Sequence, residues 1–154
     1  MTHPFQGIWV PIVSPFLQDR PDCAALGRLA RHLADSGIAG IVVGATTGEG
    51  ACLSLDEQLQ MADALRDALP AGYPLVLGLN SMDTRSACAH ARRLAAIRPA
   101  GLLVTAPPYV RPTQSGIRRH FEALAEAAGT AIVVYDIPYR TGCEIDLDTM
   151  QTLA

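Results

Sequence analysis

Short apolar runs alternate with longer stretches of helical periodicity along the chain, and this alternation limits the possible folds more than any other feature. Each run has four to six residues, too few for a helix, and lacks alternating polar residues, as is typical of strands buried on both faces. The five runs are residues 8–13, 40–43, 74–79, 101–104 and 131–135. Their order predicts an α/β fold with a parallel sheet.

The stretches between the runs carry apolar residues three or four positions apart, which indicates amphipathic helices. A capping box, Ser54-x-x-Glu57, predicts the start of a helix over residues 54–69. A further helix is expected to begin near Asp146 and to be cut off at Ala154. The four apolar stripes are Leu26, Leu29, Ala30 and Leu33; Leu55, Leu59, Ala62, Leu65 and Leu69; Ala87, Ala91, Leu94 and Ala95; and Ile117, Phe121, Leu124, Ala125 and Ala128. Helix ends are expected at Gly37, Gly72 and Gly129.

Two architectures fit this pattern, an open doubly wound sheet and a (β/α)8 barrel. A barrel of eight units has about 250 residues, or about 31 residues for each strand and its helix. At that rate the 154 residues hold about five units, in agreement with the five apolar runs. Either the sheet is open, or residues 1–154 are the N-terminal part of a single (β/α)8 barrel domain, and the loops described below favour the second interpretation.

Charge and cysteine usage argue against several classes of protein. A net charge of −3 and 18% charged residues argue against a nucleic-acid partner or an anionic membrane surface. No apolar run has the ~18 residues of a membrane span, and residues 1–4 lack the layout of a signal peptide, so a cytoplasmic location is expected. The widely spaced cysteines are expected to be reduced and mostly buried, the four histidines to be structural or solvated, and metal and cofactor sites to be absent.

All twelve basic residues are arginines, and the chain contains no lysine. Lysine is the side chain that forms imines with carbonyl substrates. A mechanism that uses a lysine nucleophile or imine is therefore impossible with these 154 residues alone.

The loops that follow the expected strands carry the unusual residues, whereas the loops that precede them are short and chemically bland. Such asymmetry is typical of a site at the carboxyl ends of parallel strands. The threonine loop lacks the lysine and glycine spacing of a phosphate-binding P-loop. The loops are residues 44–50 (Gly-Ala-Thr-Thr-Gly-Glu-Gly), Asn80-Ser81, residues 105–112 and residues 135–142.

Each of these loops also has a purely structural interpretation. The threonines could cap a tight turn, Tyr109 and Tyr135 could be half-buried aromatic residues, and Arg140 could be a surface residue. Arg140 follows Pro138 just beyond a strand, however, where its planar fork could hold a carboxylate. Two tyrosines, a threonine pair and an arginine can relay protons and bind a small carboxylate, but they include no activated nucleophile.

Three of these loops resemble the dihydrodipicolinate synthase / N-acetylneuraminate lyase family of class I aldolases, which are (β/α)8 barrels. Ala45-Thr46-Thr47-Gly48-Glu49 is similar to the family's G-T-T-G-E, residues 107–112 to its P-Y-Y-N-R-P, and residues 135–142 to its Y-N-V-P-S-R-T-G. The resemblance runs from about Gly7 to the end of the chain, and the arginine of the third motif favours the dihydrodipicolinate synthase branch.

The resemblance implies a lyase that joins pyruvate, held as a lysine imine, to aspartate semialdehyde in lysine biosynthesis. Tyr135 would act beside the imine, and Thr46 and Tyr109 would complete a proton relay, with Tyr109 reaching into a neighbouring subunit's site. Thr47 and Gly48 would hold the pyruvate carboxylate, and Arg140 the carboxylate of the second substrate. The partners implied are a small keto acid, an aldehyde and further copies of the chain in a dimer or tetramer.

Departures from the family pattern leave other functions open. The family's lysine belongs to a strand beyond Ala154, and Asp136 and Tyr139 replace the usual asparagine and serine. The leading hypothesis is the N-terminal part of a Schiff-base lyase of dihydrodipicolinate synthase type. The alternatives are a non-catalytic truncated member or partner subunit, and a related aldolase that acts on keto acids or keto-sugar acids.

Overall fold

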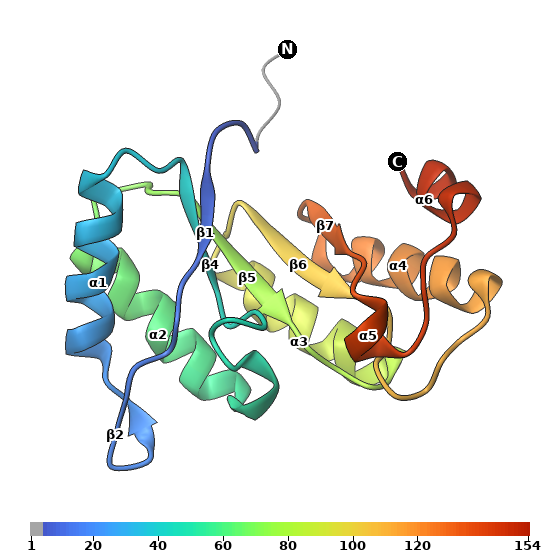
Figure 1. Ribbon diagram of the computed structural model, residues 1–154, viewed down its shortest axis with the longest axis horizontal. Coiled ribbons are helices and arrows are strands. Elements are labelled where there is room, and N and C mark those ends of the chain that lie inside the picture. The colour runs from blue at the N-terminus through green and yellow to red at the C-terminus, as the bar shows by residue number, and fades with distance from the viewer. Residues whose placement is uncertain (1–4) are drawn as a thin grey trace. The chain divides into compact units, whose positions relative to one another are not determined.

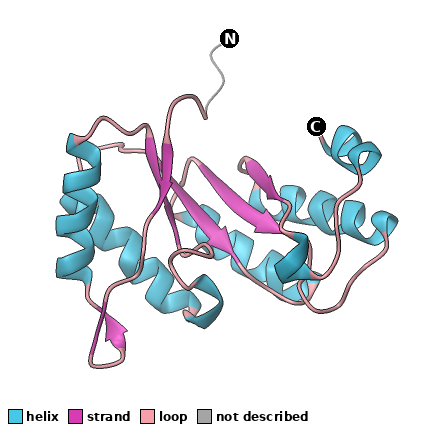
Figure 2. Ribbon diagram, viewed as in Figure 1, coloured by secondary structure: helices cyan, strands magenta, loops and turns pink. Residues whose placement is uncertain are grey.

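The computed structural model describes residues 5–154, in which strands and helices alternate (Figures 1 and 2). The chain divides into two compact units, one that ends at Gly78 and one that comprises Leu79–Ala154. Each unit is described by itself below.

The first unit is a parallel β/α structure. Strands β1 (Trp9–Pro11), β4 (Gly40–Val43) and β5 (Leu75–Leu79) lie in this order, with β4 paired in parallel to both neighbours. Helices α1 (Cys23–Asp35) and α2 (Leu55–Ala68) pack against each other, and a short 3-10 helix, η1 (Gly50–Cys52), precedes α2. A small antiparallel hairpin, β2 (Phe16–Leu17) with β3 (Arg20–Pro21), comes between β1 and α1.

The second unit continues the same alternation. Its strands, β6 (Gly101–Thr105) and β7 (Ile132–Tyr135), pair in parallel, with Thr105 opposite Tyr135. Helices α3 (Thr84–Ala96) and α4 (Gln114–Ala128) pack together, and α4 also contacts α6 (Leu147–Leu153). A one-turn helix, α5 (Pro138–Thr141), follows β7.

Side-chain caps begin the four long helices, as the sequence predicts for α2. The Ser54 hydroxyl accepts from the Glu57 amide, and the Glu57 carboxylate accepts from the Ser54 amide, so the capping box is confirmed. Asp22, Asp83 and Thr113 cap α1, α3 and α4 in the same way. These caps satisfy backbone donors that a helix leaves without partners at its first turn.

Two of the expected glycine helix ends are confirmed, and the third is wrong. Gly37 and Gly129 follow α1 and α4 with φ of +80° and +59°. Helix α2 ends at Ala68 with an extended Leu69, because Pro70 cannot continue it. Gly72 lies beyond the helix, in a turn that the Tyr73 amide closes onto the Pro70 carbonyl at 3.0 Å.

The central strands form the core, but the prediction of burial on both faces is wrong for the outer ones. Every residue of β4 and β5 is buried, whereas all four residues of β7 are half-buried and β1 has none that is buried. Among the described residues, β1 pairs only with β4 and β7 only with β6, so each has one edge without a neighbouring strand. Ala125, expected on the buried stripe of α4, is exposed.

The cysteines are free, as expected, but the expectation of mostly buried thiols is wrong. Cys23, Cys88 and Cys143 are half-buried, and Cys52 is exposed. Cys23 and Cys88 lie in the helices α1 and α3, Cys52 in η1 and Cys143 in the loop after α5, so none of them lies in a strand of the core.

The histidines differ strongly in their surroundings. His32 is exposed and His90 half-buried, while His3 lies outside the described residues. His120 is only 3% exposed, and its Nδ1 atom lies 2.9 Å from the Thr84 hydroxyl of α3. Burial lowers the pKa of His120 from 6.5 to about 4, against the opposing attraction of Asp83. This histidine is therefore a neutral, structural part of the second unit.

No helix in residues 5–154 is both long enough and apolar enough to cross a membrane.

Candidate functional site

The threonine loop follows the carboxyl end of β4 and is closed by its own backbone. The Gly48 and Gly50 amides both donate to the Ala45 carbonyl, at 3.1 and 3.0 Å, and the Glu49 amide donates to the Thr46 backbone carbonyl at 3.2 Å. Thr46 is half-buried, Thr47 is exposed and Gly48 is buried. No hydrogen bond to either threonine hydroxyl is found in the described part of the chain, so both hydroxyls can interact with a bound molecule.

Ser14 holds this loop from the end of the neighbouring strand. Its side chain is 5% exposed, and its hydroxyl donates to the Gly48 carbonyl at 2.5 Å. A Cβ atom at position 48 would lie 2.8 Å from the Ile12 carbonyl oxygen, so only glycine allows this approach. The loop thus rests directly on the segment that follows β1.

Gln58 fixes the start of the loop from helix α2. Its side chain is 8% exposed, and the amide nitrogen donates to the Gly78 carbonyl at 2.5 Å. The same nitrogen would lie 2.6 Å from a Cβ atom at Gly44, which has a φ of +64°. A Cβ at Gly78 would in turn overlap the carbonyl oxygen of Gly44. The backbone before Thr46 is therefore packed against β5 without an intervening side chain.

The sequence interpretation missed both Ser14 and Gln58. Ser14 is the first polar residue after the first apolar run, and the loops with candidate residues likewise directly follow the other apolar runs. Gln58 is a polar residue on the face of α2 that carries Met61, Ala62 and Leu65. A polar residue on a buried stripe needs a hydrogen-bond partner, and that signal could have found it.

Tyr109 lies in the loop after β6 with a strained backbone. Its φ is +72°, and Arg111 two residues later has a φ of +50°, in the region that side chains other than glycine rarely adopt. The Tyr109 amide donates to the Thr141 carbonyl at 3.3 Å, which brings this loop against α5. The side chain itself is 88% exposed.

Tyr135 and Arg140 follow in the last strand and the one-turn helix of the same unit. Tyr135 is half-buried at the carboxyl end of β7, and no hydrogen bond to its hydroxyl is found among residues 5–154. Arg140 is exposed, with its guanidinium carbon 5.5 Å from the centre of the Tyr139 ring. This contact is a cation–π interaction, which leaves the donors at the edge of the guanidinium open to a ligand.

Polar contacts hold the loop that carries Arg140. Thr141 is 2% exposed, and its hydroxyl lies 2.8 Å from the Cys143 carbonyl. Asp136 accepts from the Ile145 amide at 3.2 Å, a role that requires only an acceptor oxygen. The side-chain amide of Gln114 bonds to the Glu144 carbonyl and the Asp146 amide, at 2.9 and 3.1 Å. The loop is therefore anchored on both sides of Arg140.

The candidate residues divide between the two units. Thr46, Thr47 and Gly48 belong to the first unit, and Tyr109, Tyr135 and Arg140 to the second. In each unit they lie at or beyond the carboxyl end of a parallel strand, which is the location that the asymmetry of the loops predicts. Across residues 5–154, no group of three or more histidine, cysteine or acidic side chains is arranged to hold a metal ion.

Comparison with known proteins gives a consistent result. The model of the dihydrodipicolinate synthetase family matches residues 4–154. The 4-hydroxy-tetrahydrodipicolinate synthase of Synechococcus sp. (strain WH7803) is 43% identical over 152 residues, which are 97% of this chain and 50% of that protein. The chain thus spans about half the length of the curated relatives it matches.

Solved structures agree with the sequence comparison. The 4-hydroxy-tetrahydrodipicolinate synthase from Methylacidiphilum fumariolicum SolV is 34% identical in sequence. Its structure matches with a TM-score of 0.91 over 97% of this chain and 50% of that chain. The dihydrodipicolinate synthase of Acinetobacter baumannii, solved in complex with pyruvate, is 32% identical, with a TM-score of 0.91 over 96% of this chain and 51% of that one. The expected fold, part of a parallel (β/α)8 barrel, is confirmed by these matches, and the open doubly wound sheet is excluded.

Proposed function

Because the chain belongs to the dihydrodipicolinate synthetase family, we propose that it forms part of a pyruvate-dependent Schiff-base lyase that condenses pyruvate with aspartate semialdehyde. The observation that carries the proposal is the presence of the family's three polar motifs, in order, at the ends of β4, β6 and β7. The solved relative from Acinetobacter baumannii, whose structure contains pyruvate, supports the choice of this keto acid.

The imine must come from outside these residues. The 154 residues contain no lysine, so a lysine that lies elsewhere in the protein, or on a partner, has to bind the pyruvate carbonyl. The role of the present residues is to hold the substrates and to move protons around that imine.

Hydroxyl groups are suited to the proton transfers. Tyr135 stands at the end of β7 with its hydroxyl available, and Thr46 offers a second hydroxyl on the threonine loop. Hydroxyls in a chain pass protons without forming a free charge. Tyr109, whose strained backbone holds the ring 88% exposed, would extend the relay into the site of a neighbouring subunit.

Carboxylate binding falls to the remaining candidates. Thr47 and the backbone of Gly48 would bind the pyruvate carboxylate, because the buried contacts of Ser14 and Gln58 fix that backbone. Arg140 would bind the carboxylate of the aldehyde through its fork of donors. Fixed donors of this kind orient the two reactants and so lower the entropic part of the barrier.

Tyr139 favours a second candidate substrate for the same chemistry. Its ring lies against Arg140 and is 80% exposed, where the family pattern has a serine. The bulk of this ring could narrow the choice of aldehyde or adapt the site to a keto acid or keto-sugar acid. A non-catalytic role as a truncated member or partner subunit is the remaining alternative.

Trapping of the imine tests the proposal directly. The complete protein is incubated with pyruvate and borohydride, and its intact mass and peptides are measured. One reduced pyruvyl group is expected on a lysine outside these 154 residues. Failure to trap pyruvate in a protein that contains such a lysine would refute the proposed chemistry, and trapping without condensation of aspartate semialdehyde would point to the alternative substrates.

Substitution of Tyr135 tests the assigned role of its hydroxyl. Tyr135→Phe is expected to lower kcat by ~100-fold or more, since it removes a general acid–base group. Tyr73→Phe is the matched control, because it removes a hydroxyl that only donates to the Ile38 carbonyl at 2.9 Å. Equal kcat values for the two variants would exclude Tyr135 from the relay.

A further inference from the structure

The loop after β6 makes a tight turn around Tyr109. The Val110 amide donates to the Pro108 carbonyl at 2.9 Å, which closes a γ-turn with Tyr109 at its centre. A φ of +72° at this centre belongs to the rare and strained form of the turn. Such a conformation persists only where its surroundings impose it, so neighbouring contacts must hold the backbone of Tyr109 in place.

The loop after β7 supplies two contacts of this kind. The first is the bond from the Tyr109 amide to the Thr141 carbonyl, at 3.3 Å. The second is made by Arg111, whose side chain lies over the backbone of Gly142. A Cβ atom at position 142 would come within 2.7 Å of the Nε atom of this arginine, 3.3 Å of its Cγ and 3.5 Å of its Cδ. The stem of Arg111 therefore occupies the space that any residue other than glycine would fill at position 142.

Left-handed backbone lies on both sides of the contact between Arg111 and Gly142. Arg111 has a φ of +50° and Gly142 a φ of +77°. Gly142 also ends the one-turn helix α5, where its amide donates to the Pro138 carbonyl at 2.7 Å. A shift of the Arg111 stem would therefore affect both the turn around Tyr109 and the helix that carries Arg140.

A further link joins the two loops beyond this contact. Gln114, at the start of α4, bonds through its side-chain amide to the Glu144 carbonyl and the Asp146 amide, at 2.9 and 3.1 Å. Contacts between the loops thus lie on both sides of Gly142, at positions 141 and 144. Tyr109 and Arg140 consequently belong to one connected structure rather than to two independent loops.

We propose that Arg111 is a positioning residue that, through Gly142, holds the two loops in one arrangement. The inference rests on the proposed function, in which Tyr109 extends the proton relay and Arg140 binds the carboxylate of the aldehyde. Arg111 acts through these two residues, so loss of its stem affects the condensation and the binding of the aldehyde. Formation of the pyruvate imine is not affected, because the pyruvate carboxylate is assigned to the threonine loop of the other unit.

Steady-state kinetics of the complete protein test this role. Arg111→Ala is expected to lower kcat ~10-fold or more and to raise the KM for aspartate semialdehyde, because small displacements of reacting groups are costly in rate. The KM for pyruvate and the yield of the borohydride-trapped pyruvyl adduct should stay within about twofold of the native values. Native kcat and native aldehyde KM in Arg111→Ala would overturn the proposal. A native protein that traps no pyruvate would instead refute the proposed function, and this inference with it.

A double-mutant cycle distinguishes positioning from a general loss of structure. If Arg111 acts through Tyr109, Arg111→Ala should lower kcat less than about twofold once Tyr109→Phe has removed the hydroxyl. The increase in the aldehyde KM, which arises through Arg140, should remain in the double variant. An undiminished loss of kcat in the Tyr109→Phe background would show that Arg111 does not act through this tyrosine, and would overturn the proposal.

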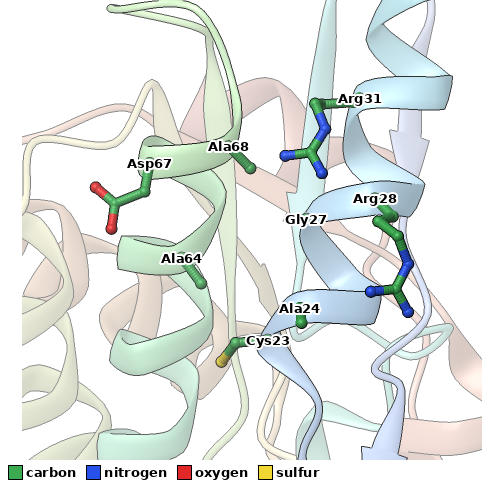
Figure 3. Close-up of a pocket in the computed structure, with 8 residues that line it drawn as sticks. All are labelled: Cys23, Ala24, Gly27, Arg28, Arg31, Ala64, Asp67 and Ala68. Carbon is green, nitrogen blue, oxygen red and sulfur yellow. The ribbon is translucent and has the colours of Figure 1, made fainter.

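Arg31→Ala is the matched control for removal of an arginine that lies over a glycine. Arg31 is also exposed, and one of its guanidinium nitrogens would lie 3.8 Å from a Cβ atom placed at Gly27. The pair lies in the groove between α1 and α2 (Figure 3), which none of the candidate residues lines. Its kcat and both KM values should therefore equal those of the native protein, and losses as large as those of Arg111→Ala would overturn the proposal.

Gly142→Ala disturbs the same contact from the opposite side. The added methyl group displaces the Arg111 stem, so the changes in kcat and aldehyde KM should match those of Arg111→Ala. Gly129→Ala is its control, since Gly129 has a φ of +59° but no atom within 4 Å of its Cβ position. Arg111→Met keeps an unbranched stem over Gly142 without the charge, and it should retain most of the native kcat. Equal kcat values in Gly142→Ala and Gly129→Ala, or a loss in Arg111→Met as large as in Arg111→Ala, would overturn the proposal.

Discussion

His120 should make the stability of the protein fall as the pH drops below neutrality. Its ring is buried in the second unit and is bonded to Thr84, and burial lowers its pKa from 6.5 to about 4. Between these two values the unfolded chain binds a proton that the folded chain does not. Acid therefore favours unfolding in this range.

The size of the effect follows from the two pKa values. Lowering the pKa of His120 from 6.5 to about 4 corresponds to about 3 kcal/mol of folding stability. This stability is fully present above pH 6.5 and is lost as the pH falls to about 4. Between pH 7 and pH 5 the expected loss is about 2 kcal/mol. Asp83 and Glu57, whose pKa values are lowered from 3.8 and 4.5 by hydrogen bonds to Ser86 and Ser54, act only at lower pH.

Urea unfolding at pH 7 and pH 5 measures this loss. His120→Asn keeps a polar atom close to the Thr84 hydroxyl but cannot titrate, so its free energy of unfolding should change far less between the two pH values. His32→Asn, at an exposed position on α1, should retain the full pH dependence of the native protein. The reasoning is refuted if His120→Asn shows the same slope as the native protein, or if the His120 ring titrates near pH 6.5 by NMR.

Three further substitutions test local features by urea unfolding. Ser54→Ala should lower the free energy of unfolding by about 1 kcal/mol because α2 loses its cap, and Ser54→Asp should keep most of the native stability. An unchanged free energy of unfolding in Ser54→Ala would contradict the cap. Gln58→Leu should cost about 1–3 kcal/mol because the Gly78 carbonyl loses its donor, and a neutral effect would mean that water replaces the amide. Gly142 and Gly37 have similar φ values, +77° and +80°, but only the Cβ position of Gly142 is crowded. Gly142→Ala should therefore lower the free energy of unfolding more than Gly37→Ala does. Equal losses would show that backbone conformation alone matters.

The sequence predicts the main strands and long helices because their periodicities are local. It misses the β2–β3 hairpin, whose turn uses Gln18 and Asp19 at φ of +51° and +60°. Such turns usually carry glycine, asparagine or aspartate at both positions, and Asp19 alone, beside Gln18, is too weak a signal. The one-turn helix α5 is hidden for a different reason, since four residues are too few to show a helical period.

The candidate site is predictable only in part, since residue type and spacing show which groups are polar but not what they contact. Thr46, Tyr109, Tyr135 and Arg140 are recognisable from the loops that carry them. Gln58 is not, because its bond to Gly78 joins residues twenty positions apart through the packing of α2 on β5.

The backbone contact between Gly78 and Gly44 has a consequence for the gene. Since a single methyl group at position 78 would overlap the Gly44 carbonyl, every missense codon there should be depleted in a library that randomises the whole chain. Gly72 has no atoms near its Cβ position and a φ of +79°, so asparagine should survive there. Position 78 is therefore restricted to glycine by contact, whereas position 72 is restricted only to residues that adopt a positive φ. Sequencing of the surviving clones would distinguish these two kinds of constraint.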